Sequence, residues 1–99
     1  MATYVLLTKL SPSSKGDADT RETLGRDWFT TVKEKCPGVV WKDHYALLGP
    51  YDFMDIYEAP SEEVAAKVAM ITMSKGAVNA ETITAIPYKK YLEIFKDVD

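Results

Sequence analysis

The order of apolar patterns along these 99 residues predicts an α+β fold, in which two helices cover one face of an antiparallel sheet. Four stretches rich in β-branched and aromatic residues alternate with two amphipathic stretches, in the order strand, helix, strand, strand, helix, strand. A Gly-Pro-Tyr-Asp tetrapeptide at positions 49–52 separates the second and third strands, as expected of a β-hairpin. This order is the ferredoxin-like plan, followed here by a short C-terminal helix.

Composition and charge are those of an ordinary globular protein of one domain, residues 1–99. The chain is 46% hydrophobic and 27% charged, with a formal net charge of −3 and no basic patch, so nucleic acid is not expected as a partner. No apolar run approaches the ~20 residues that span a bilayer, and the first residues lack a signal-peptide pattern. We therefore expect a cytoplasmic protein without membrane contact. The single cysteine, Cys36, excludes an internal disulfide framework.

The first half of the chain is expected to form one strand, a loop and one helix. Residues 3–10 are rich in β-forming residues, whereas residues 11–19 have the composition of a loop. Asp19 is then a helix N-cap with Glu22 three residues later, as in a capping box, and Pro37-Gly38 ends the helix. The stripe that should face the core recurs every four residues: Leu24, Trp28, Val32 and Cys36, with Phe29 alongside.

The second half is expected to form a hairpin, a helix, a strand and a terminal helix. Strands over 39–48 and 53–59 are joined by a type I turn in which Pro50 fixes φ. A helix follows from Pro60-Ser61 to Lys75-Gly76, and then a strand over 78–86. One side of the terminal helix should clasp a dimer partner or cover the sheet: Tyr88, Tyr91, Leu92 and Phe95.

The strands are apolar on both faces, although two helices can cover only one of them. In the first strand, Val5 and Leu7 point away from Tyr4 and Leu6, and the third strand alternates in the same way. A second apolar face needs cover, and a second copy of the same sheet is the simplest one. We therefore expect a homodimer or higher homo-oligomer, with a cavity between facing sheets.

The hairpin turn also carries a family resemblance. Gly49-x-Tyr51-Asp52 between two strands resembles the signature of the GYD domain family. Further similar features are Thr3-Tyr4-Val5 in the first strand, Glu58-Ala59-Pro60 before the second helix, and Glu81-Thr82 in the last strand. The resemblance spans nearly the whole chain and implies a homodimeric α/β barrel, but it implies no established reaction.

The register of the hairpin decides which side chains share the expected cavity. A four-residue loop over 49–52 sets His44 opposite Tyr57, with Lys42 and Asp55 on the same face. A bulged three-residue loop with a left-handed Asp52 would instead bring Tyr45 to that face. The four-residue loop is the expected form. The cavity would then be lined by Tyr4, Leu6, His44, Phe53, Asp55 and Tyr57.

His44 is the one side chain in the sequence whose ordinary pKa lies near neutrality. Beside Asp55 it could act as a general base, with Asp55 fixing its tautomer and Tyr57 donating to a developing oxyanion. It could equally be a structural histidine paired with an acid near a dimer interface, or an anchor for a ligand. One histidine and dispersed carboxylates make no metal site, and no cofactor is expected.

The hairpin signature has both structural and binding interpretations. Asp52 could accept hydrogen bonds from turn amides, and Tyr51 could pack across the hairpin or contact a ligand. Glu81 is either a paired surface acid or a cavity residue. Two functions follow: a small-molecule-binding or regulatory homodimer, or a cofactor-independent monooxygenase- or isomerase-like enzyme for a small, partly apolar compound with His44 and Asp55 as its acid–base pair.

Overall fold

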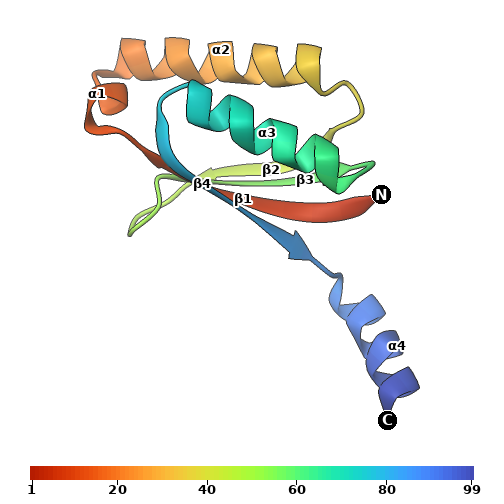
Figure 1. Cartoon of the computed structure of the whole chain (residues 1–99). Helices are drawn as coiled ribbons and strands as arrows, with labels where there is room; N and C mark the ends of the chain where they lie inside the picture. The colour runs from red at the N-terminus through yellow and green to blue at the C-terminus, as the bar shows by residue number, and fades with distance from the viewer.

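The computed structural model describes the backbone of all 99 residues and every side chain except that of Lys15. Strands β1 (Ala2–Leu10), β2 (Val40–Ala46), β3 (Phe53–Ala59) and β4 (Ala77–Ala85) form one antiparallel sheet in the order β2-β3-β1-β4. The helices are α1 (Pro12–Lys15), α2 (Ala18–Lys35), α3 (Glu62–Ser74) and α4 (Tyr88–Val98). Figure 1 shows α2 and α3 on one side of the sheet, which confirms the ferredoxin-like α+β fold.

Most of the expected helix ends are confirmed, but the N-cap Asp19 with its capping box to Glu22 was wrong. Asp17, not Asp19, caps α2, because its side chain accepts the backbone N–H of Thr20 at 2.8 Å. Ser61 caps α3 through the backbone N–H of Val64. The stretch expected to be a loop contains the single-turn helix α1, which the sequence pattern did not indicate because it is too short to show periodicity.

The hairpin register differs by two residues from the expected one. His44 pairs with Asp55 and Ala46 with Phe53, so the four-residue turn and its pairing are corrected to a wider loop over 47–52. The loop is wide because Asp52 is held by β1: its backbone N–H donates to the carbonyl of Thr8 at 2.8 Å, and its carboxylate accepts from the amide of Leu10 at 2.8 Å. The residues of the turn alone could not predict these hydrogen bonds, because their partners lie in β1.

A β-bulge in β2 changes which residues share a face. The pairing register shifts between Trp41 and Asp43, so Trp41 and His44 lie on the same face although three positions separate them. Lys42 was expected on that face by strict alternation. Lys42 still borders the cavity, but its ammonium group pairs with Glu58 at 3.2 Å, at the edge of the sheet.

The core lies between the helices and the sheet, on the face that carries Tyr4, Leu6 and Tyr57. These three side chains are buried against Val32 of α2 and Val68 of α3. The expectation that they line a space between two sheets is therefore corrected. Both faces of β1 and β3 are apolar, so alternation alone could not tell which face the helices cover.

No described residue covers the opposite face of the sheet or α4. Ile83 is 48% exposed on that face, and Phe95 is 52% exposed on α4. Figure 1 shows α4 extending from β4 away from the sheet, and the radius of gyration of 15.0 Å exceeds the ~13 Å of a compact chain of this length. Within the described part of the chain, no helix is both long and apolar enough to cross a bilayer.

Candidate ligand-binding site

A cavity of about 730 Å³ lies between the N-terminal half of α2 and the sheet. The cavity exists because α2 does not lie directly on the sheet. The backbone of α2 lies against α1 and α3, whereas the backbone of α3 contacts β1, β3 and β4 directly. Gly25 of α2 faces the cavity, and a Cβ atom there would meet no atom within 4 Å. A volume of this size suits a small organic molecule. Aromatic side chains form much of the lining: Trp28, Phe29, Trp41 and Phe53.

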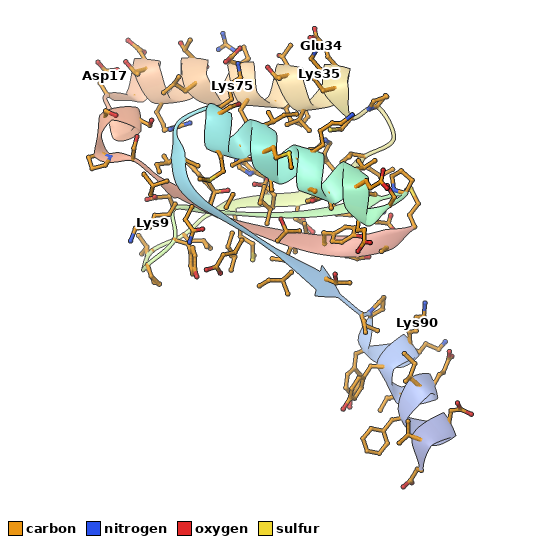
Figure 2. All side chains as sticks on the ribbon, in the orientation of Figure 1. Lys9, Asp17, Glu34, Lys35, Lys75 and Lys90 are labelled. Carbon is orange, nitrogen blue, oxygen red and sulfur yellow. The ribbon has the colours of Figure 1, made fainter. Side chains whose placement is uncertain are left out.

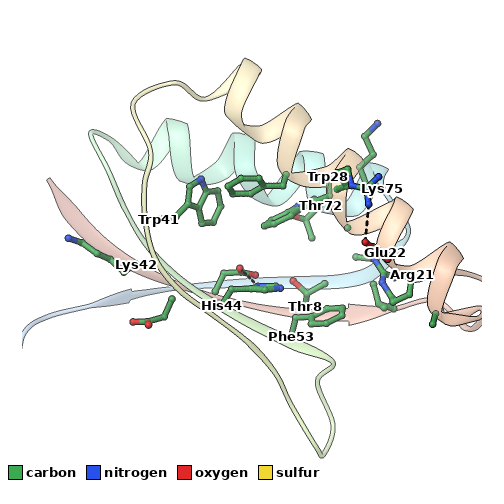
Figure 3. Close-up of a pocket in the computed structure, with 18 residues that line it drawn as sticks. Thr8, Arg21, Glu22, Trp28, Trp41, Lys42, His44, Phe53, Thr72 and Lys75 are labelled. Atoms are coloured by element: carbon green, nitrogen blue, oxygen red, sulfur yellow. Dashed lines mark hydrogen bonds and ion pairs between the residues drawn. The ribbon is translucent and has the colours of Figure 1, made fainter.

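The aromatic wall under α2 is a connected cluster. The ring centroids of Trp28 and Trp41 are 5.5 Å apart, and those of Phe29 and Trp41 are 5.9 Å apart. The indole N–H of Trp28 donates to the hydroxyl of Thr72 at 2.9 Å, which fixes the indole to α3. Figure 3 shows Trp28 and Trp41 on the side opposite His44 and Phe53. The cluster holds α2 away from the sheet. The Trp28 ring stacks over the His44 ring with centroids 6.3 Å apart, so the open space lies beside these two rings and not between them.

His44 and Asp55 form the polar floor of the cavity. Nδ1 of His44 lies 2.5 Å from Oδ1 of Asp55, which is itself buried at 2% exposure. The hydrogen bond to Asp55 raises the pKa of His44 above its ordinary value, and partial desolvation opposes this effect. Because Asp55 occupies Nδ1, Nε2 is the ring nitrogen left for another group. The pair has the parts of a general base or of an anchor for a ligand.

In the part of the chain that the structure describes, most of the cations around the cavity are paired with carboxylates, but Arg21 is not. Arg26 pairs with Glu22 at 3.0 Å, and Lys42 and Lys75 have carboxylate partners at 3.2 Å and 2.9 Å. Arg21 has no carboxylate partner among the described side chains. Its guanidinium donates to the carbonyl of Ser14 at 2.8 Å and lies over the ring of Phe53, 5.4 Å from the centroid.

The structure separates the residues that the sequence grouped as one site. His44, Phe53 and Asp55 line the cavity, whereas Tyr4, Leu6 and Tyr57 belong to the buried core. The Tyr57 hydroxyl is buried without a hydrogen-bond partner among the described residues, and burial raises the pKa of Tyr57 well above its ordinary value. That hydroxyl does not open into the cavity, so the structure gives it no place beside a substrate there.

The hairpin signature lies apart from the cavity. The Tyr51 hydroxyl donates to Oε2 of Glu81 at 2.8 Å, which ties the hairpin loop to β4. Asp52 ties the same loop to β1 through Leu10, rather than accepting from turn amides as expected. Neither Tyr51 nor Asp52 is among the residues that line the cavity. In this structure the signature fixes the end of the sheet.

Several cavity residues were absent from the sequence-based set. Trp28 was assigned to the core by its spacing and does pack against the core, but it also lines the cavity. Trp41 and Arg21 were not singled out. The available signal was the large size of Trp28 and Trp41 beside Gly25, which indicates a helix that cannot approach the sheet closely. Among the described residues, no group of three or more His, Cys, Asp or Glu side chains is arranged to hold a metal ion.

The fold and site define an α+β ferredoxin-like protein with a cavity beneath its first long helix. A model of the GYD domain matches residues 4–95, and the chain belongs to the GYD domain family. The chain is 42% identical over 92 residues to the glutamine synthetase and cystathionine beta-lyase binding protein of Thermus thermophilus, with 88% of this chain and 90% of the relative covered.

Two solved structures support the same fold at low sequence identity. MtbAldR has a TM-score of 0.62 at 17% identity over 87% of this chain, and the chain spans only 52% of its length. A dimeric ferredoxin-like protein of unknown function from Thermobifida fusca has a TM-score of 0.50 at 11% identity, with 86% of this chain and 89% of that chain covered. Identities this low show the fold alone.

Proposed function

We propose that the protein is a homodimeric regulatory module that binds a small, partly apolar molecule in the cavity between α2 and the sheet. The observation that carries this proposal is the cavity itself, which is about 730 Å³ and is bounded by fixed aromatic side chains. The relative's name supports binding to metabolic enzymes as the outcome, because that Thermus thermophilus protein is named for binding two of them.

A blocked cavity tests the binding part of this proposal. Gly25→Leu places a branched side chain in the space beneath α2 while keeping a residue that favours helix. Thr30→Leu adds a similar side chain at an exposed position of α2 outside the cavity. Isothermal titration with a panel of bicyclic aromatic compounds should detect binding by the wild type and by Thr30→Leu, and none by Gly25→Leu. Equal binding by Gly25→Leu would contradict the proposal.

The homodimer part rests on the two uncovered apolar surfaces. The exposed sheet face carries Val40, Tyr45 and Ile83 at 42%, 50% and 48% exposure, and α4 projects beyond the sheet with no buried residue. A second copy of the chain offers the same sheet face and the same helix α4. Twofold pairing of two copies would therefore cover the exposed sheet face and α4 of both copies together. The similar Thermobifida fusca protein is named as dimeric.

Sedimentation equilibrium tests the dimer. The wild type should show twice the chain mass of 11.1 kDa. Ile83→Glu on the sheet face and Phe95→Glu on α4 should each shift the equilibrium to monomer, because each buries a charge in the interface. Met70→Glu replaces an apolar residue that is 69% exposed on α3, away from both surfaces, and should leave the dimer intact. A wild-type monomer at micromolar concentration would exclude the dimer.

The short contact between His44 and Asp55 supports a second candidate function, a cofactor-independent enzyme. With Nδ1 held by Asp55, Nε2 of His44 could accept a proton from a weakly acidic C–H group and return one from solvent. In deuterated water, NMR should show the α-protons of phenylacetone exchanging faster with the wild type than with His44→Gln. Equal rates would exclude the enzyme and leave the binding module in place.

A further inference from the structure

We propose that the cavity selects a planar aromatic carboxylate, with the carboxylate bound at Arg21 and the ring held against the aromatic walls. This inference rests on the proposed binding function and specifies the chemical class of its ligand. It follows from three observations on Arg21: its charge is not neutralised, its orientation is fixed, and it lies at one end of an apolar cavity.

Arg21 differs from every other cation in the cavity lining. Arg26, Lys42 and Lys75 each pair with a carboxylate, as given above, whereas none of the described carboxylates lies within pairing distance of Arg21. The guanidinium of Arg21 donates one hydrogen bond to the carbonyl of Ser14, so most of its five N–H donors remain for a ligand. The residue is half-buried, so solvent screens its charge less than that of a fully exposed arginine.

The position of the guanidinium is fixed from two sides. The Ser14 carbonyl holds one terminal nitrogen, and the ring of Phe53 lies beneath the guanidinium plane. Both partners belong to ordered elements, α1 and β3, so little side-chain entropy remains to be lost when an anion binds. A planar fork of this kind matches the geometry of a carboxylate.

The rest of the cavity suits an aromatic ring better than a second charge. Figure 3 shows Arg21 beside Phe53 at one end of the cavity and Trp41 at the other. The acids Glu22 and Asp55 are already paired, with Arg26 and His44. Asp43 also lines the cavity and has no cation partner in the described part of the chain, although its register position opposite Ile56 belongs to the other face of the sheet. Its carboxylate accepts from the Tyr45 hydroxyl at 3.5 Å. Among the described residues of the lining, Arg21 is therefore the cation without a carboxylate partner, and Asp43 is the acid without a cation partner.

Isothermal titration with three indoles of equal ring size tests the inference. Indole-3-acetate carries a carboxylate, indole-3-acetamide is its neutral isostere, and tryptamine is cationic. The wild type should bind the acetate at least about tenfold tighter than the amide, since charge-assisted bidentate pairs are about twice as strong as neutral ones. In Arg21→Gln this ratio should fall to within about twofold. Lys35→Gln removes the same charge from an exposed site on α2 outside the cavity and should keep the wild-type ratio.

Each other outcome overturns a specific statement. Equal wild-type affinity for acetate, amide and amine would overturn the preference for an anion and leave the binding module standing. A tenfold preference that persists in Arg21→Gln would remove the role of Arg21. No heat from any of the three ligands would overturn both the inference and the binding function. Circular dichroism and thermal unfolding of Arg21→Gln show whether the variant is folded before titration.

Discussion

Helix α3 and the N-terminal half of α2 cover the same face of the sheet, but only α3 packs directly against it. Under α3, small or compact residues such as Ala65 and Val68 are fully or nearly fully buried, and the helix lies directly on β1, β3 and β4. Under the N-terminal half of α2, the bulky rings of Trp28 and Phe29 hold the backbone off and leave a cavity. Side-chain size at the interface therefore separates a packed core from a cavity.

The same division runs along α2 itself. In Figure 2, α2 lies above the sheet over its whole length. At its C-terminal end, Val32 is completely buried and Cys36 is 4% exposed, so that end belongs to the core. One turn earlier, Trp28 and Gly25 belong to the cavity lining. The boundary between the core and the cavity thus falls between positions 28 and 32.

The largest expected effect contrasts one core and one cavity substitution. Leu6→Ala should lower the free energy of unfolding by about 2–5 kcal/mol, because Leu6 is completely buried and its removal leaves a void. Phe29→Ala should cost about 1 kcal/mol, mainly the contacts with its aromatic neighbours, because Phe29 is 40% exposed. Urea denaturation measures both. Equal losses would mean that the cavity half is packed as tightly as the core.

A second test removes the hydrogen bond that joins α2 to α3. Thr72→Val keeps the side-chain shape but removes the acceptor of the Trp28 indole N–H. The loss should be about 1–2 kcal/mol, because a half-buried donor is left without its partner. The wavelength of tryptophan fluorescence should shift as Trp28 gains freedom. Trp28→Phe should cost less stability in the Thr72→Val background than in the wild type, because the hydrogen bond is already absent there. A neutral Thr72→Val would show that the bond does not hold α2 in place.

The order of elements was predictable from the sequence, and the site was not. Strand and helix signals are local, so periodicity and caps located them to within a few residues, and the hairpin signature indicated the family. The face of the sheet was undetermined because Leu6 and Leu7 are equally apolar. The register was undetermined because Asp52 is held by Thr8 and Leu10, which are distant in sequence. His44 and Asp55 were expected to lie beside each other and do so, but through a different register and beneath α2 instead of between two sheets.

A third test raises stability in the cavity half. Gly25 has an ordinary helical conformation and open space at its Cβ position. Gly25→Ala should therefore raise the free energy of unfolding by about 1 kcal/mol, because alanine favours helix over glycine by that amount. Thermal unfolding would show the increase as a higher midpoint temperature. A destabilised Gly25→Ala variant would indicate that α2 lies closer to the sheet than described, with no room for a methyl group.

The smallest expected effect is a dependence on pH. Asp55 raises the pKa of His44, so the folded state binds a proton more tightly, and the resulting stabilisation is present below the ordinary histidine pKa and lost as pH rises through the raised one. The His44 side chain is 59% exposed, which limits the effect to less than about 1 kcal/mol. Urea denaturation measures the free energy of unfolding at pH 5.5 and at pH 8.5. Between these two pH values, this free energy should fall more for the wild type than for His44→Gln. A larger drop in the variant would reverse the sign of the linkage.

The measurement that tests the account most directly is a crystal structure of the protein grown with indole-3-acetate. The expected result is a ligand between α2 and the sheet, with its ring against Trp28 or Trp41 and its carboxylate at Arg21. A structure in which α2 lies directly on β2 and β3, with Trp28 and Trp41 filling the space and no ligand beneath the helix, would contradict it.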